Sequence, residues 1–263
     1  MSVPDLPAHA WAALLIGALL VGFAKTAVGG FGSLAVVAFA AVLPAKESTG
    51  ALLPLLCLGD VVAVRTYHRH ADWRVLARLL PGVVPGIVVG AWFLTVADDT
   101  LVRKAIAATL LAMVLLQLWM RRGQLPRRSE QSAVEPRSGR RRPGDGVHGT
   151  TTATVGAVAG FATMTANAAG AVTSLYLVLV GLPVRTFLGT AAWFYLIVNA
   201  VKLPISVGLG LVTARSIALN VALVPALLVG AAAGVWAIRR LDQRRFELVV
   251  LGSTAVTAAA LWW

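Results

Sequence analysis

Long runs of uncharged, mostly apolar residues divide this chain of 263 residues into segments of membrane-spanning length. A helix that crosses a bilayer core needs about 20 mostly apolar residues, with a range of about 17–25. Several runs meet this requirement once a residue or two at each flank is included. The runs without Asp, Glu, Lys or Arg are 9–24, 26–45, 48–59, 79–97, 105–120, 149–184, 186–201, 203–214, 216–238 and 248–263. The pattern predicts an all-α polytopic membrane protein.

The runs resolve into eight to ten helical segments, with up to five in each half of the chain. The expected segments are 9–28, 31–44, 48–66, 75–96 and 100–120, then 150–167, 170–182, 187–204, 213–237 and 243–262. The second segment of each half has about 13 residues and would be about 20 Å long, which is too short for a core about 30 Å thick. We therefore expect a broken or re-entrant helix at the start of each half.

The two halves also repeat each other's sequence at a steady offset of 138 to 140 residues. The matching anchors are Gly-Phe-Ala at 22–24 and 160–162, Leu-Pro at 43–44 and 182–183, and Pro-four-Gly at 85–90 and 225–230. Duplicated hydrophobic units with broken segments at matching places are typical of secondary transporters. The predicted domains are a first membrane repeat (1–120), a basic polar linker (121–149) and a second membrane repeat (150–263).

The charged residues, only 13% of the chain, indicate how the halves are oriented. Residues 121–142 hold eight arginines against Glu130 and Glu135, which accounts for half of the net charge of +12. Such a segment is typical of a cytoplasmic loop, and it can contact anionic lipid headgroups. It lacks the folded basic surface that nucleic-acid binding requires, so no nucleic-acid partner is expected.

Two further basic loops occur at non-equivalent places in the two halves. The first half has a basic connection at 65–74, whereas the corresponding connection at 206–214 carries no charge. The second basic loop comes later, at 239–245. Placing all the basic loops on the cytoplasmic side requires the halves to have inverted topology. An odd number of segments per half gives the same result.

The remaining composition argues against an enzyme. There is one cysteine, Cys57, so a disulfide within the chain is excluded. No HExxH, P-loop or GxSxG motif is present. His68, His70 and Asp72 are candidate metal ligands, but a basic loop favours solvated side chains, so we expect no metal and no cofactor. The N-terminus lacks the basic region of a signal peptide, so its first apolar run is expected to be retained.

Three ionisable residues fall inside the apolar segments, namely Lys25, Asp60 and Lys202. A charge in the membrane costs at least about 2.5–3.5 kcal/mol, so each is a functional candidate. For Asp60 we leave structural pairing and a coupling or gating role open. Lys202 is a gating candidate together with Asn199, the repeat counterpart of Asp60; the alternative is that Lys202 snorkels to an interface.

The break in each half suggests a binding site for an anion. Glycines weaken the helix, and the half-helix that restarts after them presents unpaired N–H groups and the positive end of its dipole. A lysine beside such an N-terminus favours an anion. The alternative is that the small residues only permit close helix packing. The substrate-binding candidates are Lys25, Thr26, Gly29, Gly30, Gly32, Ser33, Thr163, Thr165, Asn167 and Gly170.

Across both halves the chain resembles the TauE/SafE family of sulfite exporters and related anion permeases. The strings that carry the resemblance lie at 22–26, 43–54, 59–60, 69–73, 166–170, 189–194 and 199–204. The resemblance implies a multi-pass transporter of the bacterial inner membrane for sulfite, sulfonates or other small oxyanions.

The expected function is secondary transport of a small anion, preferably sulfite or an organosulfonate, by alternating access at a midplane site between the two repeats. One alternative is a channel-like or uniport permease for organic acids or another small solute. An alternative of a different class is a membrane-embedded interaction or assembly subunit. Protons as the coupling ion and a homo-oligomeric state are both left open.

Overall fold

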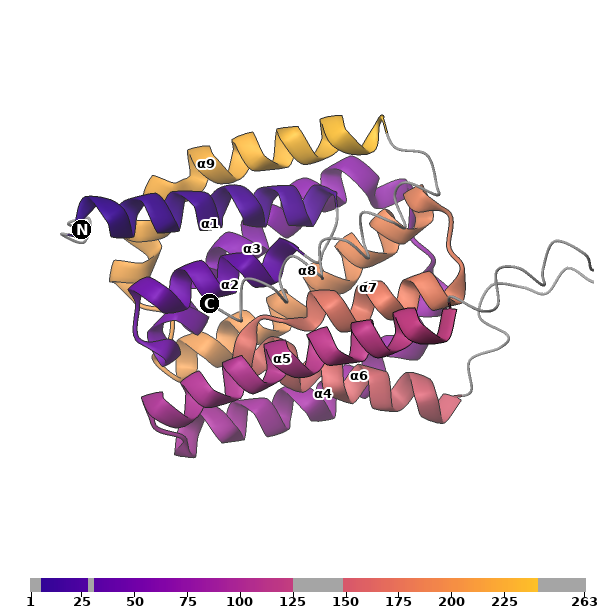
Figure 1. The fold of residues 1–263 in the computed structure, drawn as a ribbon, viewed down its shortest axis with the longest axis horizontal. Helices are drawn as coiled ribbons and strands as arrows, with labels where there is room; N and C mark the ends of the chain where they lie inside the picture. The colour runs from indigo at the N-terminus through magenta and orange to yellow at the C-terminus, as the bar shows by residue number, and fades with distance from the viewer. Residues whose placement is uncertain (1–5, 28–30, 125–148, 241–263) are drawn as a thin grey trace, which may run out of the picture.

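The computed structural model describes residues 6–27, 31–124 and 149–240, and within these it is helical without any strand (Figure 1). The first half contains α1 (Ala8–Thr26), α2 (Gly32–Val42), α3 (Ala45–Tyr67), the 3-10 turn η2 (His68–His70), α4 (Trp73–Val96) and α5 (Asp99–Gln124). The second half contains α6 (Gly149–Ala166), α7 (Ala169–Val180), α8 (Val184–Gly208) and α9 (Ala214–Ile238). The all-α prediction is confirmed, and each of these α-helices begins and ends within four residues of a predicted segment. The segment predicted at 243–262 lies outside the described residues.

Five of the described helices are long and apolar enough to cross a membrane, namely α1, α3 with η2, α4, α8 and α9. The second helix of each half is short, as predicted: α2 has 11 residues and α7 has 12. At 1.5 Å per residue these helices are about 16–18 Å long, less than the thickness of a bilayer core. The linker prediction falls mostly on residues that are not described, and α5 continues to Gln124.

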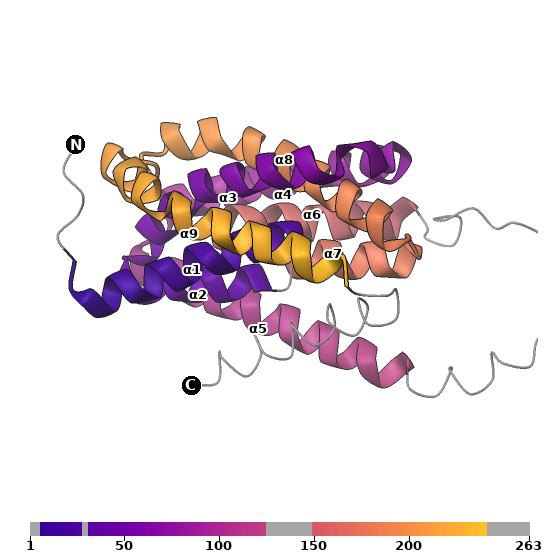
Figure 2. The same ribbon diagram turned by 90° about the horizontal axis from the view of Figure 1, so that it is seen from above.

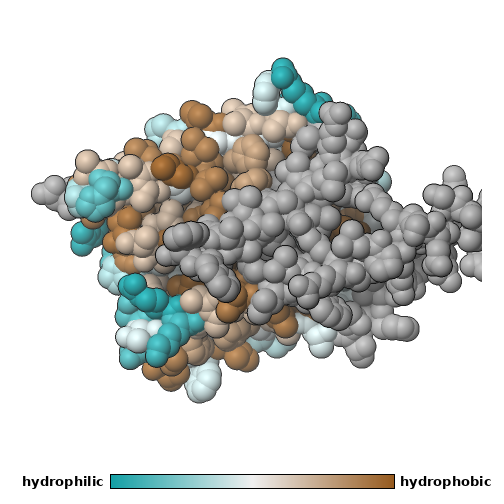
Figure 3. Space-filling view, in the orientation of Figure 1, coloured by the Kyte–Doolittle hydropathy of each residue, from teal (hydrophilic) through white to brown (hydrophobic). Residues whose placement is uncertain are grey.

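The outer surface is apolar along the helices. Large apolar side chains such as Trp92 of α4 and Val221 of α9 are about two-thirds exposed. Among the coloured residues of Figure 3, most of those between the ends of the helices are apolar, and hydrophilic residues lie toward the left and the upper right. Large apolar side chains exposed along the described helices suit a protein surrounded by lipid.

The first helix of each half packs against the fourth helix of the other half. The first helix of the chain, α1, packs against α9, while its repeat counterpart α6 packs against α4, the counterpart of α9 (Figures 1 and 2). Between these two pairs, α3 packs against its own counterpart α8. The reciprocal pairing is what a duplicated unit would produce when its copies interlock.

The repeated glycines lie where these helices cross. A Cβ atom on Gly22 would overlap the carbonyl oxygen of Leu227, and one on Gly160 would overlap that of Val83. Small residues therefore bring the backbones of α1 and α9, and of α4 and α6, into direct contact. Gly22 and Gly160 therefore have the packing role that is the alternative for small residues.

Candidate substrate-binding site

The chain breaks between α1 and α2 and again between α6 and α7. α1 ends at Thr26, whose carbonyl oxygen accepts a hydrogen bond of 2.9 Å from the Tyr67 hydroxyl. At the second break Asn167 has φ 50°, in the left-handed region that asparagine tolerates better than most residues. Both following helices, α2 and α7, begin without a side-chain hydrogen bond at the N-cap. Their N-cap residues, Phe31 and Ala168, therefore supply no side chain that caps the first N–H groups.

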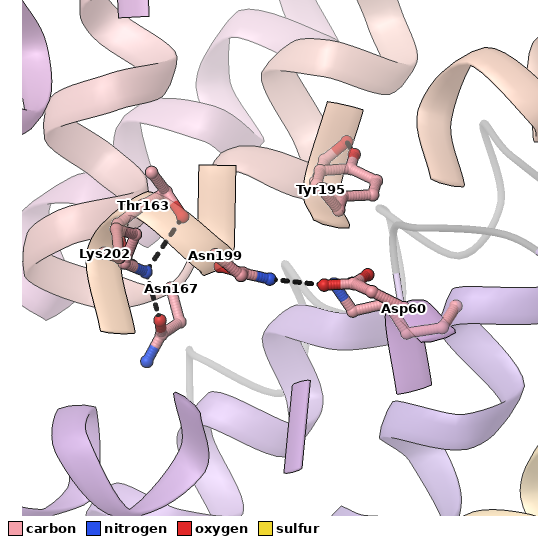
Figure 4. A network of polar contacts seen from close by, with 8 residues as sticks. Asp60, Thr163, Asn167, Tyr195, Asn199 and Lys202 are labelled. Atoms are coloured by element: carbon pink, nitrogen blue, oxygen red, sulfur yellow. Dashed lines mark hydrogen bonds and ion pairs between the residues drawn. The ribbon is translucent and has the colours of Figure 1, made fainter. Parts of the chain in front are cut away.

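Lys25 is held by a buried carboxylate on the neighbouring helix. Its Nζ lies 2.7 Å from Oδ1 of Asp60 on α3, and the two side chains are 10% and 0% exposed. The other carboxylate oxygen of Asp60 accepts a hydrogen bond of 2.6 Å from Nδ2 of Asn199 on α8 (Figure 4). The Lys25 ammonium also lies 4.5 Å from the ring centroid of Tyr195, within the range of a cation–π contact. Asp60 thus links a cation of the first half to an amide of the second.

Lys202 forms a separate cluster with the second break. Its Nζ donates to the carbonyl and hydroxyl oxygens of Thr163 and, at 2.7 Å, to Oδ1 of Asn167 (Figure 4). Asn167 in turn donates from Nδ2 to the carbonyl oxygen of Thr49, at 2.9 Å. Lys202 is only 1% exposed, so the alternative that it snorkels to an interface is wrong. Within the described residues no carboxylate lies at ion-pair distance from it.

A cavity of about 40 Å³ lies between these two clusters. Its lining residues are Val21, Ala24, Lys25, Gly32, Leu56, Thr163, Asn167, Ala169, Gly170, Tyr195 and Asn199. Both breaks thus contribute to one cavity, together with the start of α2 and of α7. A single water needs about 10–15 Å³ of such space, so the cavity has room for a few waters or a small ion. Lys202 lies behind its wall, where it holds Thr163 and Asn167 in place.

The remaining candidate residues are arranged differently. The Thr26 hydroxyl donates to the carbonyl oxygens of Gly22 and, at 2.9 Å, Ala231, so it joins α1 to α9. The Thr165 hydroxyl donates to the carbonyl of Phe161. Neither these two residues nor Ser33 is among those that line the cavity. Gly29 and Gly30 lie outside the described residues.

Tyr195 and Thr49 belong to the site but were not singled out from the sequence. Tyr195 lies four residues before Asn199 on α8, so a helical reading of that segment places both side chains on one face. This spacing was the signal available for Tyr195. Thr49 takes part through its backbone carbonyl, for which the sequence holds no signal.

In the basic connection after α3, Asp72 has a structural role. The Asp72 carboxylate accepts from the backbone N–H groups of Arg74 and Val75, and so caps the start of α4. His68 and His70 are exposed in η2. No group of three metal-ligating side chains occurs in the part of the chain that was described.

Five apolar helices of spanning length around buried charges define a multi-pass membrane protein. Comparison with protein families then identifies the family to which it belongs. The family model for the sulfite exporter TauE/SafE matches residues 14–261, and the chain belongs to this family. Members of the family are membrane transporters, so the resemblance noted from the sequence is confirmed and transport of an anion is the family's activity. No curated protein and no solved structure matched the chain in the same comparisons.

Proposed function

We propose that the protein is a secondary transporter of a small anion, with sulfite or an organosulfonate as substrate, and that the anion binds in the cavity between the two helix breaks. The observation that carries this proposal is that Lys25 and the uncapped starts of α2 and α7 line one cavity. An ammonium group and two helix N-termini all favour negative charge.

The size and lining of the cavity support a small oxyanion. Around Lys25 the polar groups of the wall are neutral, from Thr163, Asn167, Tyr195 and Asn199. Hydroxyl and amide groups can donate hydrogen bonds to oxyanion oxygens without adding charge. A volume of about 40 Å³ matches an ion of a few heavy atoms better than a bulky organic acid.

Alternating access is the mechanism that we propose for this site. The two halves, in inverted orientation, would rock about the α3–α8 contact and expose the cavity to each side in turn. The Lys25–Asp60 pair spans α1 and α3, and the Asp60–Asn199 bond spans α3 and α8. Breaking or reforming these contacts would gate the site, and a proton on Asp60 would couple transport to a pH gradient.

The test is flux of radiolabelled sulfite and methanesulfonate in proteoliposomes. Lys25→Met should lower the rate at least about tenfold, because a buried charge that contacts an anion contributes about 2–5 kcal/mol. Lys104→Met is the matched control: Lys104 is exposed at the start of α5, and its loss should leave the rate unchanged. Unchanged transport of every anion by Lys25→Met would refute the assignment of the site.

The same assay separates a coupled carrier from a channel-like pathway. A coupled carrier concentrates the labelled anion against its gradient when a pH gradient is imposed, whereas a channel or uniporter only equilibrates it. Deletion of 121–142 tests the interaction subunit. Loss of all function on this deletion, with normal function of Lys25→Met, would favour that class over transport.

A further inference from the structure

The three buried or nearly buried charges of the site do not cancel. Lys25 and Asp60 form an ion pair, while Lys202 is bonded to neutral oxygens only. Three oxygen acceptors around its Nζ match the three N–H donors of a charged ammonium group. Among the residues that the structure describes, Lys25, Asp60 and Lys202 therefore give the site a net charge of plus one.

Lys202 lies close enough to the cavity for its charge to act there. Thr163 and Asn167, which accept its hydrogen bonds, both line the cavity. Asn199, which also lines the cavity, lies three residues before Lys202 on α8 and therefore on the same face of that helix. In a low-dielectric surrounding a charge one residue removed from the cavity still attracts an anion inside it.

We infer that this site selects a monovalent oxyanion, and that Lys202 supplies the charge which the bound anion neutralises. The inference rests on the proposal that the cavity binds the anion. A monoanion brings the total charge of Lys25, Asp60, Lys202 and ligand to zero. A dianion leaves one negative charge uncompensated in the membrane interior, which is costly. The substrate class is therefore a sulfonate or hydrogen sulfite rather than a divalent ion such as sulfate.

Lys25 has a different role in this scheme. Its charge is already matched by Asp60, so it contributes direct contact and orientation rather than the net charge. If so, removing Lys25 and Asp60 together leaves the net charge of the site at plus one, whereas removing Lys25 alone takes it to zero and leaves a buried carboxylate without its partner. The double variant should bind a monoanion better than the single variant does.

Equilibrium binding to the purified full-length protein tests the inference with two probes, methanesulfonate and sulfate. They are both tetrahedral and similar in size but carry one and two negative charges. The wild-type protein should bind methanesulfonate at least about tenfold more tightly than sulfate. Asp60→Asn, which raises the site to plus two, should reverse or abolish that preference. Lys202→Met should lower methanesulfonate affinity at least tenfold, while Lys202→Arg should largely preserve it.

A second arm remains informative if Lys202→Met does not fold. It compares Lys25→Met with Lys25→Met/Asp60→Asn, and the double variant is expected to recover methanesulfonate binding by several-fold or more. Equal affinity of the wild type for both probes, no change in preference in Asp60→Asn, or no recovery in the double variant would each overturn the charge assignment. These results differ from failure of the proposed function, in which the wild type binds neither probe and transports no anion.

Discussion

At the scale of single residues, Asp60 is the side chain that joins the two halves of the proposed site. It is fully buried, and its two oxygens contact groups from different halves of the chain, Lys25 and Asn199. Protonation of the carboxyl would remove the charge that holds Lys25 and weaken the bond from Asn199. A buried carboxylate with one cationic partner is thus suited to respond to a proton.

We predict that Asp60→Asn removes the dependence of transport on a pH gradient. The carboxylate is faced by Lys25 from α1 and by Asn199 and Tyr195 from α8. Cys57 lies one turn earlier on α3, and Lys202 lies one turn beyond Asn199 on α8. In the wild type, flux should increase when an imposed pH gradient supplies protons from the side of the substrate. The variant should keep one rate with or without the gradient, measured in proteoliposomes.

Asp98→Asn provides the control for this measurement. Asp98 is a carboxylate outside the site, and it accepts a hydrogen bond of 2.7 Å from the backbone of Leu101 at the start of α5. Asparagine caps helices as well as aspartate does, so this variant should keep both the rate and the response to the gradient. A normal gradient response in Asp60→Asn would show that the coupling proton binds elsewhere.

At the scale of helices, the sequence predicts the elements better than their contacts. Apolar runs gave the positions of the described helices, since length and hydropathy are properties of each segment alone. Contacts between segments about 139 residues apart, such as Asp60 with Asn199, depend on packing that one sequence does not reveal. Lys202 illustrates the difference. The predicted segment 187–204 ends two residues after Lys202, but α8 continues through Pro204 to Gly208, which keeps Lys202 in the interior.

The interlocked helix pairs lead to a prediction about the glycines at their crossings. Gly22→Ala and Gly160→Ala would each place a methyl group against the backbone of the partner helix. Overpacking of this kind costs about 1–3 kcal/mol, so thermal unfolding of the detergent-solubilised protein should occur several degrees lower. Gly208→Ala is the control, because nothing lies within 4 Å of a Cβ there. Equal stability of all three variants would show that α1–α9 and α4–α6 do not approach as closely as described.

At the scale of the whole molecule, the reciprocal pairing of α1 with α9 and of α6 with α4 gives a frame in which the two halves are equivalent. The charged residues break that equivalence. Lys25 corresponds to Thr163 in the repeat, Asp60 to Asn199, and Lys202 to Ala63. Each half nevertheless joins its first helix to its third by one lysine, through Lys25–Asp60 in one half and Lys202–Thr163 in the other. If the halves are inverted, a rocking motion of one half against the other would therefore act on two different contacts, an ion pair in the first half and a hydrogen bond in the second.

Inverted topology can be tested with single cysteines placed in equivalent connections. The basic connection at 65–74 is expected on the cytoplasmic side and its counterpart at 206–214 on the outside. In a Cys57→Ser background, which removes the chain's one cysteine, an impermeant thiol reagent added to intact cells should label Gly208→Cys. It should label His70→Cys and Ser132→Cys only after the membrane is opened. If the repeats are parallel, Gly208→Cys and His70→Cys should instead have the same accessibility to the reagent. This result would exclude alternating access between inverted halves, but it would not contradict the proposed anion site.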